Sequence, residues 1–443
     1  MQWKKLLCSE RIRKSSGRGA DLRSEFEKDY HRIISSASFR RLQDKTQVFP
    51  LDKSDFVRTR LTHSLEVSSF GRSLGKCAAT VIMRDGLDGD FMPRYSNDIC
   101  DILSCAGLIH DIGNPPFGHF GETVIRKWFK KNLPLLTYKG RLLSDILSPQ
   151  MKGDFYNYEG NAQALRLVTK LHYVVDFHGM NLTKGLLSAC IKYPCFSTET
   201  DLSKKDKTRS KPGVFYSEKE IFEDIDSSCG TEGKRNPLVF LLEAADDIAY
   251  KTADIEDAFK KGLISFDTLK SELGEYGKLL INTSGEYKAV QNFIVDVQRK
   301  ALNAAAESFG RNYSALMNGE FKTELLSGTD EGELLSRLGD IAYKYAFSNR
   351  QIYLLELGAD NIISTLLNTF VPAVLEPDDP DGINMRVFSL ISENYKKACE
   401  VYSKDKTEDE RIYLRLMLAC DYISGMTDSF ARGLYREIKG VQP

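Results

Sequence analysis

Four side chains that could bind a metal ion or transfer a proton lie in one short stretch of the chain. His110 and Asp111 are adjacent, and His119 and Glu122 follow within the same stretch, which spans residues 108–122. A neutral imidazole beside a carboxylate suits a divalent cation, which takes nitrogen and oxygen ligands but needs more than two of them. This stretch therefore predicts part of a metal site, and other parts of the chain must supply the remaining ligands.

A helix is expected to position the first two of these side chains. Apolar residues recur at helical spacing before His110 and after a polar run at 96–98, namely Ile99, Ile102, Leu103, Ala106 and Ile109. This pattern predicts a buried helix that closes at His110 and Asp111. The Gly-Asn-Pro-Pro run at residues 113–116 ends it, because proline cannot continue a helix.

Two other predicted helices carry candidate ligands. One opens shortly before His63 and places this residue beside its apolar face. Another, over residues 237–259, carries Asp246, Tyr250 and Asp254 at i, i+4 and i+8, which is a single stripe. Acidic stripes usually face solvent. Here the neighbouring positions are mainly apolar, so we expect a buried stripe that needs a cation or hydrogen-bond donors.

A single histidine in such a context is more often a hydrogen-bonded core residue than a ligand, because ligation needs several partners. The chain has 6 histidines, and three of them (His63, His110 and His119) occur near predicted helices with polar neighbours. Their grouping with the acidic residues favours a metal site over three separate core histidines.

Composition describes a globular protein with no overall charge preference. The 443 residues are 42% hydrophobic, and 61 basic against 62 acidic residues leave a net charge of -1, so no overall field favours nucleic acid or a membrane surface. The 9 cysteines include no C-x-x-C pair and read as reduced thiols. No apolar run reaches the ~20 residues that span a bilayer. We therefore expect a cytoplasmic protein with no membrane association.

The chain reads as helix after helix, with two exceptions. Residues 1–25 are expected to form a flexible N-terminal arm, because the region that begins at residue 8 is charged and rich in serine and glycine. Residues 197–236 are polar and form a predicted insertion, in which residues 213–216 are the best candidate for a short strand or hairpin. The Gly-rich phosphate loops of nucleotide-binding folds are absent from the sequence, so phosphate binding must use side chains and metal.

Several longer sequence motifs give the chain a specific resemblance to a known family. The pattern of His63, His110–Asp111 and Asp246 resembles the signature of HD-domain metal-dependent phosphohydrolases. The phrases at residues 40–50, 58–67, 110–122, 159–163, 243–250 and 421–428 resemble, in the same order, those of the bacterial dGTP triphosphohydrolases. The resemblance covers roughly residues 22–436.

This resemblance implies an all-α, mainly helical HD-domain fold with at most a small β-hairpin in an insertion. An HD-type catalytic domain would span residues 26–350, with the insertion at 197–236, and a C-terminal helical region at 351–443 would pack on the same core. The implied activity is metal-dependent hydrolysis of deoxynucleoside triphosphates, with dGTP the expected substrate, to the deoxynucleoside and tripolyphosphate.

The resemblance also implies roles for individual residues. The metal, which could be Mg²⁺, Mn²⁺ or another transition metal, would be held by His63, His110, Asp111 and Asp246. Asp247 would support this site from outside the ligand set. His119 would act at the α-phosphate as nucleophile or general acid, and Glu122 would orient it.

The same resemblance implies the residues that bind the substrate. Tyr250 would stack beneath the sugar and crowd a 2′-hydroxyl, while Gln47 and Asp254 would bind the 3′-hydroxyl. The expected phosphate contacts are Arg60, Lys192 and Tyr193. Fixed cations at this site would stabilise both the bound triphosphate and the charge that develops on the leaving group.

Assembly and two alternative functions stay open on the sequence alone. The family suggests a homo-oligomer, either a hexamer or a tetramer, and a nucleotide effector or single-stranded nucleic acid as a further partner. One alternative function is an HD-type phosphohydrolase that acts on another nucleotide phosphoester, which would release no tripolyphosphate. The other is a nucleotide-sensing or single-strand nucleic-acid-binding protein, which would not need His119 and Glu122.

Overall fold

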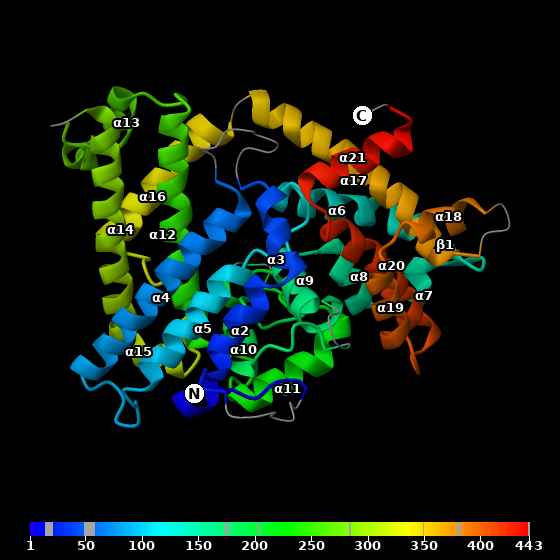
Figure 1. Ribbon diagram of the computed structural model, residues 1–443, viewed down its shortest axis with the longest axis horizontal. Helices are drawn as coiled ribbons and strands as arrows, with labels where there is room; N and C mark the ends of the chain where they lie inside the picture. Colours follow the sequence, from blue (N-terminus) through cyan, green and yellow to red (C-terminus); the bar gives the residue numbers. More distant parts are fainter. Residues whose placement is uncertain are drawn as a thin grey trace.

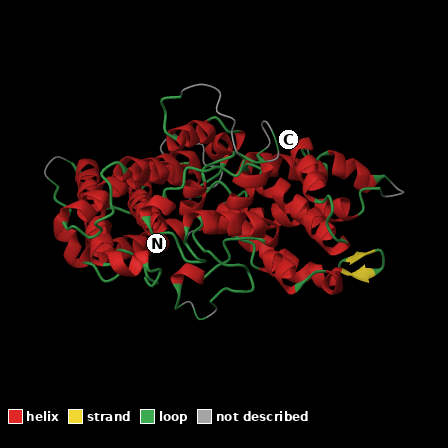
Figure 2. Ribbon diagram, turned by 90° about the horizontal axis from the view of Figure 1, so that it is seen from below, coloured by secondary structure: helices red, strands yellow, loops and turns green. Residues whose placement is uncertain are grey.

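The computed structural model describes residues 1–13, 21–47, 58–172, 176, 178–201, 203, 205–282, 285–348, 350–378 and 382–441. These residues form a mainly helical fold in which the described β-structure is one two-stranded antiparallel hairpin and two isolated bridges. Figure 2 shows helices through the whole molecule and the hairpin at one end. The predicted all-α fold with a small hairpin is therefore confirmed.

The elements have the following bounds. The N-terminal part forms α1 (Trp3–Leu6), α2 (Glu25–Ile34), α3 (Ala37–Arg41), α4 (Arg60–Arg84), α5 (Tyr95–Ile109) and α6 (Gly118–Asn132). The middle part forms β1 (Thr137–Tyr138), β2 (Arg141–Leu142), α7 (Leu143–Ile146), α8 (Pro149–Tyr156), α9 (Gly160–Arg166), α10 (Lys184–Cys190), α11 (Lys219–Cys229) and α12 (Pro237–Lys260). The last part forms α13 (Phe266–Glu272), α14 (Glu286–Arg311), α15 (Tyr313–Met317), α16 (Asp330–Ala342), α17 (Arg350–Leu375), α18 (Ile383–Ser389), α19 (Glu393–Tyr402), α20 (Glu408–Ser424) and α21 (Asp428–Lys439). Short 3₁₀ or π-helical turns are η1 (Leu42–Asp44), η2 (Leu133–Leu135), η3 (Leu167–Leu171), η4 (Lys207–Arg209), η5 (Tyr216–Glu218), η6 (Gly274–Leu279) and η7 (Tyr343–Phe347).

Helices α4 and α5 pack closely along each other and carry two of the candidate ligands. A Cβ added at Gly107 of α5 would lie 2.6 Å from the backbone nitrogen of Ser68 on α4, so only glycine permits this approach. Beside this contact the hydroxyls of Ser68 and Ser104 are hydrogen-bonded at 2.9 Å. Helix α12 packs against both α4 and α5. The three helices thus meet near the C-terminal end of α5.

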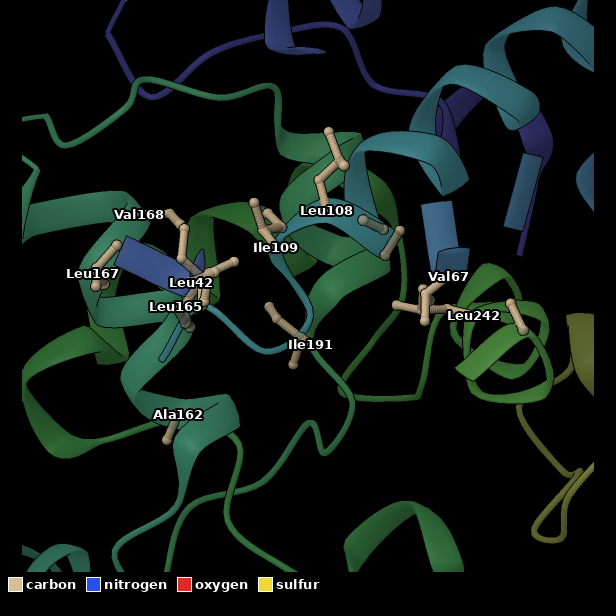
Figure 3. Close-up of a cluster of buried hydrophobic side chains, with 14 of the residues drawn as sticks. Leu42, Val67, Leu108, Ile109, Ala162, Leu165, Leu167, Val168, Ile191 and Leu242 are labelled. Carbon is tan, nitrogen blue, oxygen red and sulfur yellow. The ribbon is translucent and has the colours of Figure 1, made fainter. Parts of the chain in front are cut away.

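The end of α5 rests on the hydrophobic core. Leu108 and Ile109 are buried there, in the same cluster as Val67 of α4 and Leu242 of α12. Figure 3 shows these side chains together with others from the cluster, including Ile191. Close packing on several sides fixes the helix end, because a packed interior permits little movement of the backbone. The residues that follow Ile109 therefore leave the core in a defined direction.

Helices far apart in the sequence occupy the two ends of the molecule. At one end α12, α14 and α16 pack together, and at the other lie α18 and the hairpin (Figure 1). The hairpin precedes the 197–236 insertion, so its predicted location at residues 213–216 is wrong. Residues 213–215 are irregular and Tyr216 begins η5; Val214 and Phe215 are buried in the core, and the segment pairs with no other strand among the described residues.

The N-terminal segment packs against the core, and the predicted flexible arm is wrong for residues 1–13. Trp3 and Leu6 are buried, and the indole Nε1 of Trp3 donates to the Tyr313 hydroxyl at 2.7 Å. Arg11 is buried against the Asp29 carboxylate at 2.6 Å. Local composition predicts that a charged residue is exposed to solvent when its ion-pair partner lies elsewhere in the chain. This is why the composition of the N-terminal region predicted a flexible arm. Residues 14–20 lie outside the described residues.

Two other expectations from composition can be compared with the structure. All nine cysteines are free thiols, as predicted. Among the described helices, none combines the length and the apolar composition that crossing a membrane requires.

Candidate active site and metal centre

Three of the four predicted metal ligands lie together. His63 comes from the first turns of α4, His110 follows the last residue of α5, and Asp246 lies on α12. One ligand atom from each of them lies within 4.8 Å of the other two. The Asp246 Oδ1 atom is 3.1 Å from the Nε2 atom of His63 and 3.6 Å from that of His110. Close packing of α4, α5 and α12 thus places two imidazoles on one carboxylate.

The orientation of His110 suits a metal ligand. Its Nδ1 atom donates to the Gly107 carbonyl at 2.8 Å, so Nε2 of the neutral ring carries a lone pair. This Nε2 atom is buried and has no hydrogen-bond partner among the described residues. It faces a carboxylate oxygen of Asp246 at 3.6 Å, so the two atoms could both coordinate one cation. The donor set therefore fits a divalent metal ion.

Asp111, the fourth predicted ligand, is next to this group but has other partners. Its Oδ2 atom lies 3.6 Å from the Nε2 atom of His110 and forms an ion pair with Arg60. Its Oδ1 atom accepts a hydrogen bond from the Asn114 amide at 2.7 Å. Burial alone would raise the pKa of the Asp111 carboxyl, but the Arg60 guanidinium and the nearby imidazoles hold it well below its usual range. Asp111 is therefore an anion at the edge of the candidate metal group.

The neighbouring Asp246 and Asp247 have different environments. Burial opposes ionisation of Asp246, but His110 and the hydrogen-bonded His63 hold its pKa well below the usual range. The Asp247 side chain is more exposed and forms an ion pair with Lys251, one turn along α12, at 2.9 Å. Among the described residues the partner of Asp247 is Lys251, so the predicted supporting role of Asp247 toward the candidate ligands stays a prediction.

His119 and Glu122 lie one helical turn apart in α6 and contact each other. The Nδ1 atom of His119 is 3.3 Å from Oε2 of Glu122. The His119 side chain is 69% exposed, whereas that of Glu122 is 1% exposed. The hydrogen bond that His119 donates to the Glu122 carboxylate raises the pKa of His119. An accessible imidazole that holds its proton more firmly than usual can serve as a general acid.

Glu122 is held from several sides. Its Oε1 atom accepts a hydrogen bond from the Gly160 amide at 3.0 Å, and a Cβ at Gly160 would lie 2.7 Å from this oxygen. The Arg126 guanidinium is 3.7 Å away. Burial would raise the pKa of Glu122, but the hydrogen bond and charge of His119, together with Lys211 and Arg126, lower it. Glu122 is thus a buried anion that fixes the ring of His119.

A second buried carboxylate lies beside this pair. Glu159 contacts Arg126 at 3.5 Å and the Nζ atom of Lys211 at 3.1 Å. Lys211 belongs to the 197–236 insertion, so the insertion brings a cation to the site. Sequence reasoning did not single out Lys211, and no local spacing could have identified it, because its partner is distant in the chain. The phrase at residues 159–163 was the one signal that pointed to this region.

Arg60 is buried beneath the start of α6. Gly118 has a positive φ of 61°, and a Cβ at this position would lie 2.2 Å from the Nη2 atom of Arg60. Glycine therefore serves both the left-handed turn and the space for the guanidinium. This packing joins Arg60, on α4, to the turn that leads into His119.

Lys192 and Tyr193 lie against two residues that the sequence did not single out. The Nζ atom of Lys192 is 3.4 Å from Glu243 and 5.8 Å from the centre of the Tyr193 ring. Arg235 lies 5.6 Å from the same ring centre and forms an ion pair with Glu243. Burial would lower the pKa of Lys192, but Glu243 in particular raises it. Lys192 therefore remains a cation near Asp246.

Tyr250, Asp254 and Gln47 supply a stacking ring and two acceptors. The Tyr250 ring stacks on Phe347 with centres 6.4 Å apart, and burial, followed by the charge of Asp254, raises the pKa of its hydroxyl. Burial, followed by the charge of Asp257, raises the pKa of Asp254 to about 8. The Oδ2 atom of Asp254 and the Oε1 atom of Gln47 are buried and have no hydrogen-bond partner among the described residues. Each could accept a hydrogen bond from a bound ligand.

The fold and the site define the class of protein: it is mainly helical and has a candidate metal group near an exposed histidine that pairs with a buried carboxylate. No family model matches the chain. A deoxyguanosinetriphosphate triphosphohydrolase-like protein of Listeria monocytogenes is 43% identical over 466 aligned residues, which cover 100% of both chains. One from Pseudomonas aeruginosa is 34% identical over 99% of each chain, and the deoxyguanosinetriphosphate triphosphohydrolase of Yersinia enterocolitica is 33% identical over 94% of each. The chain belongs to the deoxyguanosinetriphosphate triphosphohydrolase family.

Proposed function

We propose that this protein hydrolyses deoxynucleoside triphosphates, preferably dGTP, to the deoxynucleoside and tripolyphosphate. The names of its full-length relatives support this activity. The observation that carries it is the pairing of exposed His119 with buried Glu122, adjacent in the chain to the ligand His110. A protein that only binds nucleotides has no need of an acid held in this way.

A divalent cation would be held by His63, His110 and Asp246, with Asp111 beside them. When bound, such an ion supplies positive charge that attracts the triphosphate and polarises its phosphorus–oxygen bonds. We propose Mg²⁺, Mn²⁺ or another transition metal, because the donor set mixes imidazole nitrogen with carboxylate oxygen.

We assign to His119 the role of general acid, which gives a proton to the leaving 5′-oxygen. Its Nδ1 atom faces Glu122, so Nε2 is the nitrogen directed away from the carboxylate. Water adds to the α-phosphorus while the bond from phosphorus to the 5′-oxygen breaks, and Nε2 gives its proton to that oxygen. The proton that the attacking water loses restores the imidazolium. Glu122 stabilises the charged ring and keeps it oriented throughout.

Substrate binding is assigned to two groups of side chains. The phosphates would contact Arg60, Lys192 and Tyr193, and Lys211 adds a cation on the side of Glu159. The sugar would stack on Tyr250, whose ring would crowd a 2′-hydroxyl. The Asp254 and Gln47 oxygens that have no partner among the described residues would take the 3′-hydroxyl.

An assay of products tests the proposal. Purified protein is incubated with each dNTP, singly and in pairs, and with GTP, in the presence of Mg²⁺ or Mn²⁺. We expect equal amounts of deoxynucleoside and tripolyphosphate, fastest with dGTP. Release of monophosphate or pyrophosphate instead would assign the chain to another phosphoester reaction, and binding without turnover would make it a sensor. The pairs of dNTPs test for an activating nucleotide.

We also propose that the protein works as a homo-oligomer in the cytoplasm. The support is the membership of the family and the absence of a spanning helix among the described residues. Sedimentation of the purified chain, with and without dGTP, measures the number of subunits. Added single-stranded nucleic acid in the same experiment tests for the second partner class.

A further inference from the structure

A buried carboxylate from the C-terminal helix joins two segments of the site. Asp428 is the first residue of α21 and is 1% exposed. Its Oδ1 atom accepts a hydrogen bond from the Phe117 amide at 2.9 Å. Its Oδ2 atom accepts one from the Thr46 amide at 3.0 Å and one from the Thr46 hydroxyl. Each oxygen of Asp428 thus serves a different segment of the chain.

The first segment is the turn that leads into His119. Phe117 has a φ of 62°, the left-handed region that side chains other than glycine rarely adopt. Such a conformation persists only where the surroundings hold it. The bond to Asp428 is made by the amide of this strained residue, two positions before His119. Asp428 therefore holds the turn that sets the direction of α6.

The second segment is residues 45–47, which includes Gln47. Thr46 pairs with Thr59 in an isolated antiparallel bridge, and the Lys45 carbonyl accepts a hydrogen bond from the Arg60 amide at 3.0 Å. Thr59 in turn caps α4, the helix that carries His63. Asp428 therefore also fixes the position of Gln47 relative to the start of α4.

Lys45 strengthens the same connection. Its buried Nζ atom donates to the Asn114 carbonyl at 2.6 Å and to the Ser424 carbonyl at 2.7 Å. Asn114 lies in the turn between α5 and α6, and Ser424 is the last residue of α20. Residues 424–428 are thus bound both to the turn before His119 and to the segment before Gln47. Figure 1 shows α20 and α21 near α17, which also packs against α6.

We infer that Asp428 is a positioning residue, which holds the turn before His119 and the segment before Gln47 in one fixed relation. The general acid and the acceptor for the sugar then face the same bound nucleotide. This inference rests on the proposed function for its catalytic consequence, and on the three hydrogen bonds of Asp428 for its structural one.

The test compares Asp428→Asn with Thr427→Ala. Asparagine keeps the shape of the side chain but replaces one acceptor with an NH₂ group, so either Thr46 or Phe117 loses its acceptor. The Thr427 hydroxyl caps α21 by accepting from the Phe430 amide at 3.2 Å, and among the described residues it bonds to neither segment. Thr427→Ala therefore reports what weakening of α21 alone does. Steady-state rates are measured with dGTP and with its 2′,3′-dideoxy analogue, and hydrogen exchange is measured for the peptides that contain residues 45–47 and 115–119.

We expect kcat of Asp428→Asn for dGTP to fall at least ~10-fold below that of Thr427→Ala, because the acid is no longer held at the reacting bond. The preference for dGTP over the dideoxy analogue should shrink in Asp428→Asn and stay at the wild-type value in Thr427→Ala. Hydrogen exchange should be faster in Asp428→Asn, and not in Thr427→Ala, at the peptide whose amide loses its acceptor. A residue that merely stabilises α21 would change neither the preference nor the exchange selectively.

Equal rates and equal exchange in the two variants would overturn the inference, as would faster exchange with an unchanged preference and rate. If the wild-type protein releases no tripolyphosphate, the proposed function fails, and the exchange data alone decide whether Asp428 holds both segments. If Asp428→Asn does not fold, Thr46→Val takes its place, since it removes only the hydroxyl that donates to Asp428. That variant should lose part of the preference for the 3′-hydroxyl, and wild-type values would overturn the inference.

Discussion

His63, His110 and Asp246 come from three helices, whereas His119 and Glu122 lie one turn apart on a single helix. The ring of His110 is mostly buried, and that of His119 is exposed. Shielded groups suit an ion that must be held against water, and an accessible ring suits a proton that must reach the substrate. The candidate metal group thus depends on packing across the fold, and the proposed acid depends on local helix geometry.

The largest effect should come from breaking the metal group. Asp246→Ala and His63→Ala each remove one of few ligands, so both variants should lose the bound metal and more than about 100-fold of the activity. Metal analysis of the purified proteins checks this. Asp247→Ala is the matched control on the same helix, since the described partner of Asp247 is Lys251. Full metal occupancy in the first two variants would refute the assignment of the ligands.

His119→Ala should separate chemistry from metal binding. The described contacts of His119 include Glu122 and none to His63, His110 or Asp246, so the variant should keep its metal and still bind dNTP. Its turnover should fall by about 10²- to 10⁴-fold, which is the usual contribution of a positioned acid. Bound metal, nucleotide affinity and turnover are measured on one preparation. Loss of metal would make His119 a ligand, and near-normal turnover would place the acid elsewhere.

Glu122→Gln should have a smaller effect that depends on pH. The Glu122 hydrogen bond and charge raise the pKa of His119, so the imidazolium persists to higher pH in the wild-type protein. Activity that needs the protonated ring is lost as the pH rises through this pKa. Glutamine removes the charge and lowers the pKa of His119, so the alkaline limb of the kcat profile should move to lower pH.

Adding Glu122→Gln to His119→Ala should cost little more than His119→Ala alone, because residues that act as one unit do not add. An unchanged alkaline limb in the single variant, or additive losses in the double variant, would show that the two residues act independently.

The smallest effect should be on the choice of sugar. Tyr250→Ala opens the space beneath the sugar, so the preference for dGTP over GTP should fall by about 10- to 200-fold, the usual range for steric discrimination of a small group. Competition between the two nucleotides measures it. Tyr250→Phe is the control, because it keeps the ring that stacks on Phe347 and loses only the hydroxyl. Equal turnover of GTP and dGTP by the wild-type protein would exclude a steric gate.

Local pattern predicted the elements of the site well. The apolar spacing before His110 predicted a helix that closes there, and α5 ends at Ile109. The stripe of Asp246, Tyr250 and Asp254 was expected on one buried helix face; α12 carries all three, with Asp254 buried and the other two half-buried. These features depend on the period of the helix and on the residues that end it, and both can be recognised from residues close together in the sequence. The i, i+3 spacing of the His119 and Glu122 pair is local in the same way.

By itself the sequence determined the helical class, the residue types at the site, and membership of a family through its phrases. Tertiary structure decided which charges meet. Lys211 reaches Glu159, Arg235 reaches Glu243, and Asp428 reaches Phe117 across the fold. It also decided that Arg11 is buried rather than solvated, because Asp29 lies opposite it. A charged side chain can be buried when folding brings an oppositely charged partner next to it. The spacing of residues along the chain does not identify that partner, because the partner is distant in the sequence.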